Sequence, residues 1–138
     1  MPHTIRDIAT ALGAEAVGDL DLIILRASEP ASAGPQDLAL AMDPRYGDGI
    51  AKGAAQAALI WPGADWLALG LKAAIFAPRG RLAMAGLSVM LDPGPDIAFG
   101  IHPMSVVDPS ATIGEGAAIG PFVTIGAHAR IGARARIA

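Results

Sequence analysis

The sequence predicts an α/β domain that continues into the start of a left-handed parallel β-helix. Three features predict this fold: a period of six at the C-terminal end, helix and strand patterns before it, and a Pro- and Gly-rich break between them. We place the α/β domain at 1–96, a linker at 97–100 and the β-helix at 101–138. Because the repeat stops in mid-pattern, we expect this chain to be a truncated form of a longer parent.

The repeat places a β-branched aliphatic residue at every sixth position. These leading residues are Ile101, Val107, Ile113, Ile119, Ile125, Ile131 and Ile137. A period of six fits neither an α-helix nor an alternating strand, and it predicts a triangular solenoid with three sixes per coil. We expect the leaders at 113, 119, 125 and 131 to point inward. We expect the residues that permit the corner conformation to be Gly114, Gly120, Gly126 and Gly132.

The first hundred residues carry helix and strand signals in turn. Thr4 is predicted to cap a helix, with Asp7 three residues later and Gly13 at its end. Strand-like runs lie at 14–17, 22–25, 37–42, 57–61 and 73–77. This order of elements is typical of a small α/β domain.

Two further helices are predicted between and after these strands. Asp43, followed by a proline, is expected to start a helix that runs to about residue 52. A helix at 81–91 is amphipathic, and we expect it to bury Leu82, Ala85 (or Gly86) and Val89.

The composition argues against several classes of function. The absence of cysteine excludes disulfides, thiolate metal sites and a thiol nucleophile. A net charge of −3, without a basic stripe among aromatic residues, argues against nucleic acid as a partner. No apolar run has the length of a membrane span, and charged residues interrupt any signal peptide. We therefore expect a cytoplasmic protein.

Three stretches are similar to the patterns of one known family. The segment Gly34–Tyr46 reads GPQDLALAMDPRY, against a family pattern of G-P-x-D-L-S-F-L-x-N-P-K-Y. A helix precedes Asp92-Pro93, and the repeat begins IHPMSVVDPSATIGEGAAIGPFVTIG. With these features the whole chain resembles the N-terminal part of the UDP-3-O-acylglucosamine N-acyltransferases of lipid A biosynthesis.

That resemblance implies a homotrimeric enzyme without a cofactor. It implies transfer of a 3-hydroxyacyl group from acyl carrier protein to the 2-amino group of UDP-3-O-acylglucosamine. In the family a Phe and a Tyr sandwich the uracil, and an Asn contacts its edge. These positions fall on Leu40, Tyr46 and Asp43, which are therefore the candidate uridine-binding residues. The family's catalytic His lies in later coils, so we expect no catalytic residue in this chain.

Other functions remain open on the residues alone. The chain fits a non-catalytic uridine-nucleotide-binding and oligomerisation module, or another hexapeptide sugar acyltransferase, although the segment Gly34–Tyr46 argues against the latter. Some carbonic anhydrases on this scaffold bind metal through three His, but His3, His102 and His128 include no H-x4-H pair, so we expect no metal. We expect His102 to be structural and His128 to be solvated. A basic cluster that faces solvent or an acidic carrier protein comprises Arg130, Arg134 and Arg136.

Overall fold

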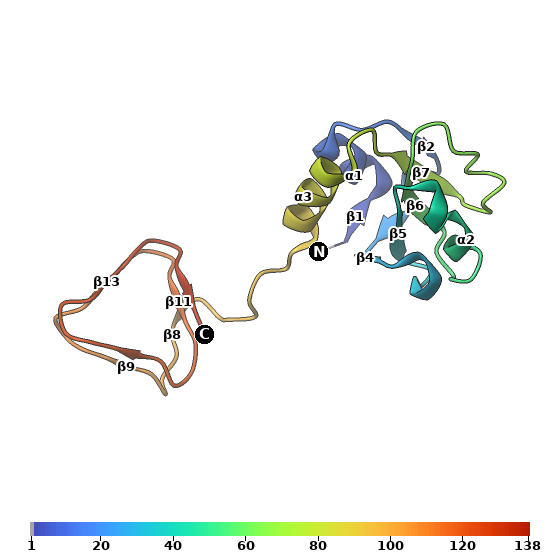
Figure 1. Ribbon diagram of the computed structural model, residues 1–138. Coiled ribbons are helices and arrows are strands. Elements are labelled where there is room, and N and C mark those ends of the chain that lie inside the picture. Colours follow the sequence, from blue (N-terminus) through green and yellow to red (C-terminus); the bar gives the residue numbers. More distant parts are fainter. Residues whose placement is uncertain (1) are drawn as a thin grey trace. The chain divides into compact units, whose positions relative to one another are not determined.

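The computed structural model describes residues 2–138. The chain divides at Asp92 into two compact units, the second of which is Pro93–Ala138 (Figure 1). The division comes at the start of the Pro- and Gly-rich segment that follows the last predicted helix of the first unit. None of the helices within residues 2–138 has the length and apolar character that crossing a membrane requires.

The first unit is built around a five-stranded sheet with the strand order β2-β7-β6-β5-β4. Its strands are β2 (Ala16–Gly18), β4 (Arg26–Ser28), β5 (Asp37–Ala41), β6 (Ala57–Ile60) and β7 (Ala73–Phe76). Strands β4 to β7 are parallel, and β2 pairs antiparallel with β7. A separate ladder joins β1 (His3–Thr4) to β3 (Ile23–Ile24). All five predicted strands are confirmed, whereas β1 and β4 were not predicted.

Helices cover both faces of the five-stranded sheet (Figure 1). Helices α1 (Ile5–Leu12) and α3 (Gly80–Leu91) lie on one face, and α2 (Gly47–Ile50) lies on the other. Because strand side chains alternate between faces, Leu38 and Leu59 pack with α1 and α3, whereas Ala39 and Ile60 pack with Ile50 of α2. The unit is therefore a three-layer α/β arrangement with a core on each side of the sheet.

Helix α1 begins and ends where the sequence predicts. The Thr4 Oγ1 accepts a hydrogen bond from the Asp7 N–H at 3.1 Å, and the Asp7 carboxylate accepts one from the Thr4 N–H at 3.0 Å. The backbone bond from Thr4, and then the side-chain bond, lower the pKa of Asp7 below its ordinary value. Gly13 ends the helix at a φ of 60°, the left-handed conformation that glycine adopts most readily.

We expect Thr4→Ala to lower the free energy of unfolding by about 1 kcal/mol, because the N–H of Asp7 loses its acceptor. Thr4→Ser keeps a hydroxyl at the same place and should retain most of the stability. Urea denaturation followed by circular dichroism compares the two variants. Equal losses for both would show that the cap contributes nothing.

Helix α3 buries a different face from the one predicted. Leu82 and Val89 are 65% and 80% exposed, whereas Ala83 and Leu87 are buried. The prediction was wrong because the helix carries apolar side chains on all its faces. Two apolar stripes therefore fit the helical period, and packing against the sheet determines which of them is buried. Of the predicted alternatives, Gly86 does face the core: a Cβ there would lie 2.8 Å from Cδ2 of Leu12.

The segment after β5 is less regular than the helix predicted for it. Asp43 does act as an N-cap, accepting a hydrogen bond from the Arg45 N–H at 3.1 Å. The chain then forms a 3₁₀ helix, η2 (Pro44–Tyr46), and the single turn of α2. The helix ends at Ile50 rather than near residue 52. Another 3₁₀ turn, η1 (Pro30–Ser32), lies between β4 and β5.

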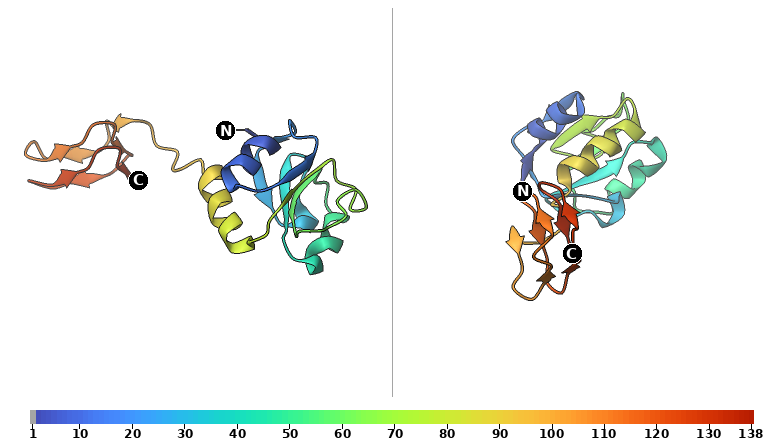
Figure 2. Two further views of the ribbon diagram at one scale, coloured as in Figure 1. Left: turned by 90° about the horizontal axis from the view of Figure 1, so that it is seen from above. Right: turned by 90° about the vertical axis from the view of Figure 1, so that its left-hand side faces the viewer.

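The second unit consists of stacked coils (Figure 2). Its strands have two residues each, and each strand ends at a leading residue of the repeat. The strands are β8 (Gly100–Ile101), β9 (Val106–Val107), β10 (Thr112–Ile113), β11 (Ala118–Ile119), β12 (Thr124–Ile125), β13 (Arg130–Ile131) and β14 (Arg136–Ile137). They form three parallel sheets, β8-β11-β14, β9-β12 and β10-β13. Ile113 pairs with Ile131, 18 positions later, which confirms three sixes per coil.

Burial of the leading residues agrees with the predicted register. Ile119 and Ile125 are 1% and 6% exposed, and Ile113 and Ile131 are half-buried. Ile101 is 49% exposed, since no coil of the described chain covers it on one side. The leaders therefore form the apolar interior of the coils.

The corner residues are not the glycines that we predicted. Apart from Gly100 in β8, the positive φ angles within the described coils occur three positions after a leader, at Gly116, Phe122, His128 and Arg134. None of the four glycines that directly follow a leader has a positive φ. A Cβ on Gly114 would instead overlap the backbone of Ala133, and one on Gly120 would lie 3.2 Å from the carbonyl oxygen of Ile137. The close approach of the next coil therefore explains glycine at these two positions.

Candidate functional site

A depression of about 550 Å³ lies beyond the carboxyl ends of two parallel strands of the first unit. Its lining residues are Leu40, Met42, Asp43, Arg45, Tyr46, Gly80, Arg81 and Met84. They come from β5 and the η2 turn after it, and from the start of α3, which follows β7. Because β5 and β7 both run parallel to β6, their carboxyl ends lie at the same edge of the sheet. Ligands of open α/β sheets usually bind at this edge.

All three residues predicted to contact uridine line this depression. Leu40 is partly buried, and its side chain packs against the core beneath α1 and α3. The Asp43 side chain is 48% exposed, and Tyr46 is 49% exposed. One depression therefore offers an apolar side chain, an acceptor and an aromatic ring to the same ligand.

Arg45 links the two more polar candidates. Its Nε lies 3.4 Å from Oδ1 of Asp43, and its Cζ lies 5.1 Å from the centroid of the Tyr46 ring. The same Oδ1 accepts the Arg45 N–H. Within the described residues no hydrogen bond reaches Oδ2 of Asp43, so this oxygen is able to accept from a ligand. Arg45 also lies over one face of the Tyr46 ring.

The buried carboxylate of Asp37, the first residue of β5, accepts hydrogen bonds from neighbouring segments. Asp37 is 4% exposed and accepts hydrogen bonds from the Gly34 N–H at 2.8 Å, Ser28 Oγ at 2.9 Å and Arg26 Nε at 2.9 Å. Burial raises the pKa of Asp37, but the bonds from Gly34, Ser28 and Arg26 together outweigh it and lower that pKa below its ordinary value. This network ties β4 and the turn before β5 to the strand that positions Leu40.

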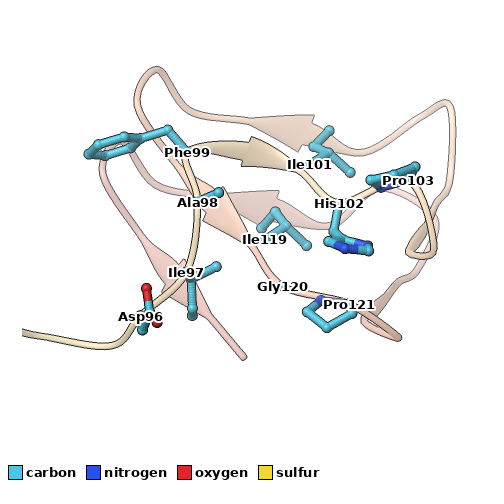
Figure 3. A pocket seen from close by; sticks show the side chains of 10 residues that line it. All are labelled: Asp96, Ile97, Ala98, Phe99, Ile101, His102, Pro103, Ile119, Gly120 and Pro121. Atoms are coloured by element: carbon cyan, nitrogen blue, oxygen red, sulfur yellow. The ribbon is translucent and has the colours of Figure 1, made fainter.

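The second unit has a smaller depression of about 260 Å³ (Figure 3). Most of its lining is apolar, from Ile97 and Phe99 to Ile119 and Pro121, and its titratable side chains are Asp96 and His102. The Nδ1 of His102 accepts a hydrogen bond from the Met104 N–H at 3.1 Å, as expected for a structural histidine.

His128 and the basic cluster lie outside both depressions. His128 is exposed, as predicted, and occupies a coil corner with a φ of 59°. Arg136 donates a hydrogen bond to the Pro95 carbonyl at 2.7 Å and stacks over the ring of Phe99. Among residues 2–138, no three His, Cys, Asp or Glu side chains lie close enough together to hold a metal ion.

Comparison with known proteins identifies the chain's relatives. It is 61% identical over 111 residues to a UDP-3-O-acylglucosamine N-acyltransferase of Ruegeria pomeroyi. The matched segment covers 80% of this chain and 31% of that protein. The chain is a relative of the UDP-3-O-acylglucosamine N-acyltransferases. The N-acyltransferase of Paracoccus denitrificans is 53% identical over 78% of the chain, and the match covers 29% of that protein. The N-acyltransferase of Pseudomonas aeruginosa is 37% identical over 80% of the chain, and the match covers 33% of that protein.

The match to these N-acyltransferases is confined to part of each relative. The chain spans about a third of the length of the curated relatives it matches. No protein-family model matches the chain. The identities to these N-acyltransferases confirm the sequence resemblance over about 80% of the chain, and each match concerns a segment of the relative rather than its whole length.

The motif at Gly34–Tyr46 did not reveal the whole depression. Sequence reasoning missed Met42, Arg45, Arg81 and Met84 as lining residues. Two of these, Met42 and Arg45, lie inside the segment Gly34–Tyr46, whereas Arg81 and Met84 lie far along the chain. The only signal for Arg81 is that it follows the strand at 73–77, because residues that follow parallel strands meet at one edge.

Proposed function

We propose that this chain is the uridine-nucleotide-binding part of a UDP-3-O-acylglucosamine N-acyltransferase of lipid A biosynthesis. In this proposal, residues 1–96 hold the nucleotide, 97–100 form a linker, and 101–138 are the first coils of a left-handed β-helix. The whole enzyme acts in the cytoplasm as a homotrimer. It transfers a 3-hydroxyacyl group from acyl carrier protein to the 2-amino group of UDP-3-O-acylglucosamine.

One observation carries the proposal: the three residues that the sequence resemblance assigns to the family's uracil site line a single depression at the carboxyl edge of the sheet. Two of them differ in type from the family pattern, yet the fold brings all three together. Identity of 61% to the R. pomeroyi protein supports the same function for the parent of this segment.

Each of the three residues has a distinct role in the proposed complex. Tyr46 stacks on one face of the uracil, an interaction worth about 1–3 kcal/mol for a base on an aromatic ring. Leu40 covers the opposite face with apolar surface but without an aromatic quadrupole. The free Oδ2 of Asp43 accepts the uracil N3–H. Since one aromatic face is lost, we expect weak binding of UDP, with a Kd of roughly 1 mM.

We expect the double substitution Leu40→Phe with Asp43→Asn to tighten UDP binding about fivefold to tenfold. The added ring contributes about 0.5–1.5 kcal/mol, and the Asn amide is able to donate to a uracil carbonyl. Leu67→Phe adds the same ring at a residue that is 68% exposed and outside the depression. NMR titration with UDP compares the variants, and equal changes in both would count against the assignment.

A chimera tests the enzymatic part of the proposal. These 138 residues replace the matching third of the R. pomeroyi enzyme, and N-acyl transfer from acyl carrier protein is measured. We expect an active chimera in which Tyr46→Ala raises the KM for UDP-3-O-acylglucosamine more than it lowers kcat. A chimera that folds and binds UDP but transfers no acyl group would contradict the enzymatic proposal.

A further inference from the structure

We infer that Arg81 forms a diphosphate subsite, so that the depression takes a nucleoside diphosphate with its base at Tyr46 and its phosphates at Arg81. The inference rests on the proposed uridine site and extends it. It adds a residue to which the motif at Gly34–Tyr46 does not point.

One of the two arginine side chains that line the depression is available to bind an anionic ligand. Its lining carries two guanidinium groups and one carboxylate, those of Arg45, Arg81 and Asp43. Arg45 is paired with Asp43 and stacked on Tyr46. Arg81 makes no hydrogen bond or ion pair of its side chain with any residue of the described chain, and it is exposed. The positive charge of Arg81 is therefore free to meet an anionic ligand, and a guanidinium matches the geometry of phosphate oxygens.

Arg81 and Tyr46 follow different strands of the sheet and line the same depression. Tyr46 follows β5 and Arg81 follows β7, with β6 between them in the sheet. Two strand spacings amount to about 10 Å. This separation of the strand ends leaves room for the ribose of a nucleotide whose base lies on Tyr46 and whose phosphates lie on Arg81.

The beginning of α3 adds to this positive potential. No side chain caps the N-terminus of α3, and its first turn contains no acidic residue. Gly80, the first residue of the helix, also lines the depression. The unbonded N–H groups of a first helical turn favour negative charge. They supplement Arg81 and introduce no carboxylate that would compete with phosphate.

Titrating uridine and UDP separately into three proteins tests the inference. The proteins are the wild-type chain, Arg81→Gln and Arg79→Gln, and the last removes the same charge two residues away, outside the depression. We expect the wild type to bind UDP about tenfold more tightly than uridine. Arg81→Gln should lose most of this advantage while its uridine affinity changes less than about twofold, and Arg79→Gln should keep it.

The outcomes separate the diphosphate subsite from the uridine site. Equal affinities of the wild type for uridine and UDP would overturn the subsite and leave the uridine site standing. Equal loss of the UDP advantage in both variants would also overturn it, because general positive potential would then explain the preference. If neither ligand binds a wild-type chain whose NMR spectrum shows it folded, the proposed function and the subsite both fall.

Discussion

Asp37→Ala is expected to lower the free energy of unfolding of the first unit by about 3 kcal/mol. The substitution leaves the Gly34 N–H and the Ser28 hydroxyl without their acceptor and removes the partner of Arg26. Asp37 is almost completely buried, so water does not replace these bonds without rearrangement. Asp37→Asn keeps one acceptor oxygen and should cost less.

An exposed pair in the same unit provides the control. Arg6 and Asp21 form an ion pair at 3.1 Å, and their side chains are 58% and 80% exposed. Asp21→Ala should therefore change the free energy of unfolding by less than about 1 kcal/mol. Urea denaturation of both variants measures the difference, and similar losses would show that the buried network has no special weight.

The Asp37 network should also make stability depend on pH. Its pKa is lower in the folded chain than in the unfolded chain, so it contributes stability above the unfolded pKa. That contribution is lost as pH falls through the folded value. We expect the stability difference between wild type and Asp37→Asn to shrink below about pH 4. A difference that stays constant to lower pH would contradict the lowered pKa.

Gly114→Ala is expected to destabilise the coils by about 2–3 kcal/mol. The added Cβ would overlap the backbone of Gly132 and Ala133 in the next coil, and backbone atoms within a parallel ladder cannot move aside independently. Thermal unfolding followed through the NMR signals of the second unit measures the loss.

The same position of a later repeat gives a matched control. Gly132 occupies the place after its leader that Gly114 occupies, but no later coil of the described chain lies next to it, and a Cβ there meets no described atom within 4 Å. Neither glycine has a positive φ, so Gly132→Ala should be neutral or stabilise by about 0.4–1 kcal/mol through the unfolded state. If both variants were equally destabilised, a conformational demand on glycine rather than close coil packing would be the cause.

The sequence predicted the coils well because their period is tied directly to their geometry. An aliphatic residue at every sixth position suffices to place each strand, and each strand does end at such a residue. The role of glycine was harder to predict, since glycine serves both positive φ and close backbone approach. The residues at the corners, among them Phe122 and Arg134, carry no signal of their left-handed conformation.

In the first unit, the predictions were good for elements bounded by Gly or Pro and poorer where tertiary packing decides. Strand β1 runs directly into the helix cap at Thr4, and β4 begins two residues after the end of β3, so neither stands apart in the sequence as a separate run. The buried face of α3 depends on contact with the sheet, which an evenly apolar helix does not encode. For the same reason, Arg81 became part of the candidate site only through the strand order.

The central claim is that the depression around Tyr46 binds uridine, and a residue-resolved NMR map of UDP binding tests it most directly. We predict shifts centred on Leu40, Asp43 and Tyr46, largely preserved in Tyr46→Phe and absent in Tyr46→Ala. Loss of stacking of about 1–3 kcal/mol takes an already weak ligand beyond detection. Shifts centred on Phe99 and His102 of the second unit, or unchanged in Tyr46→Ala, would contradict the account.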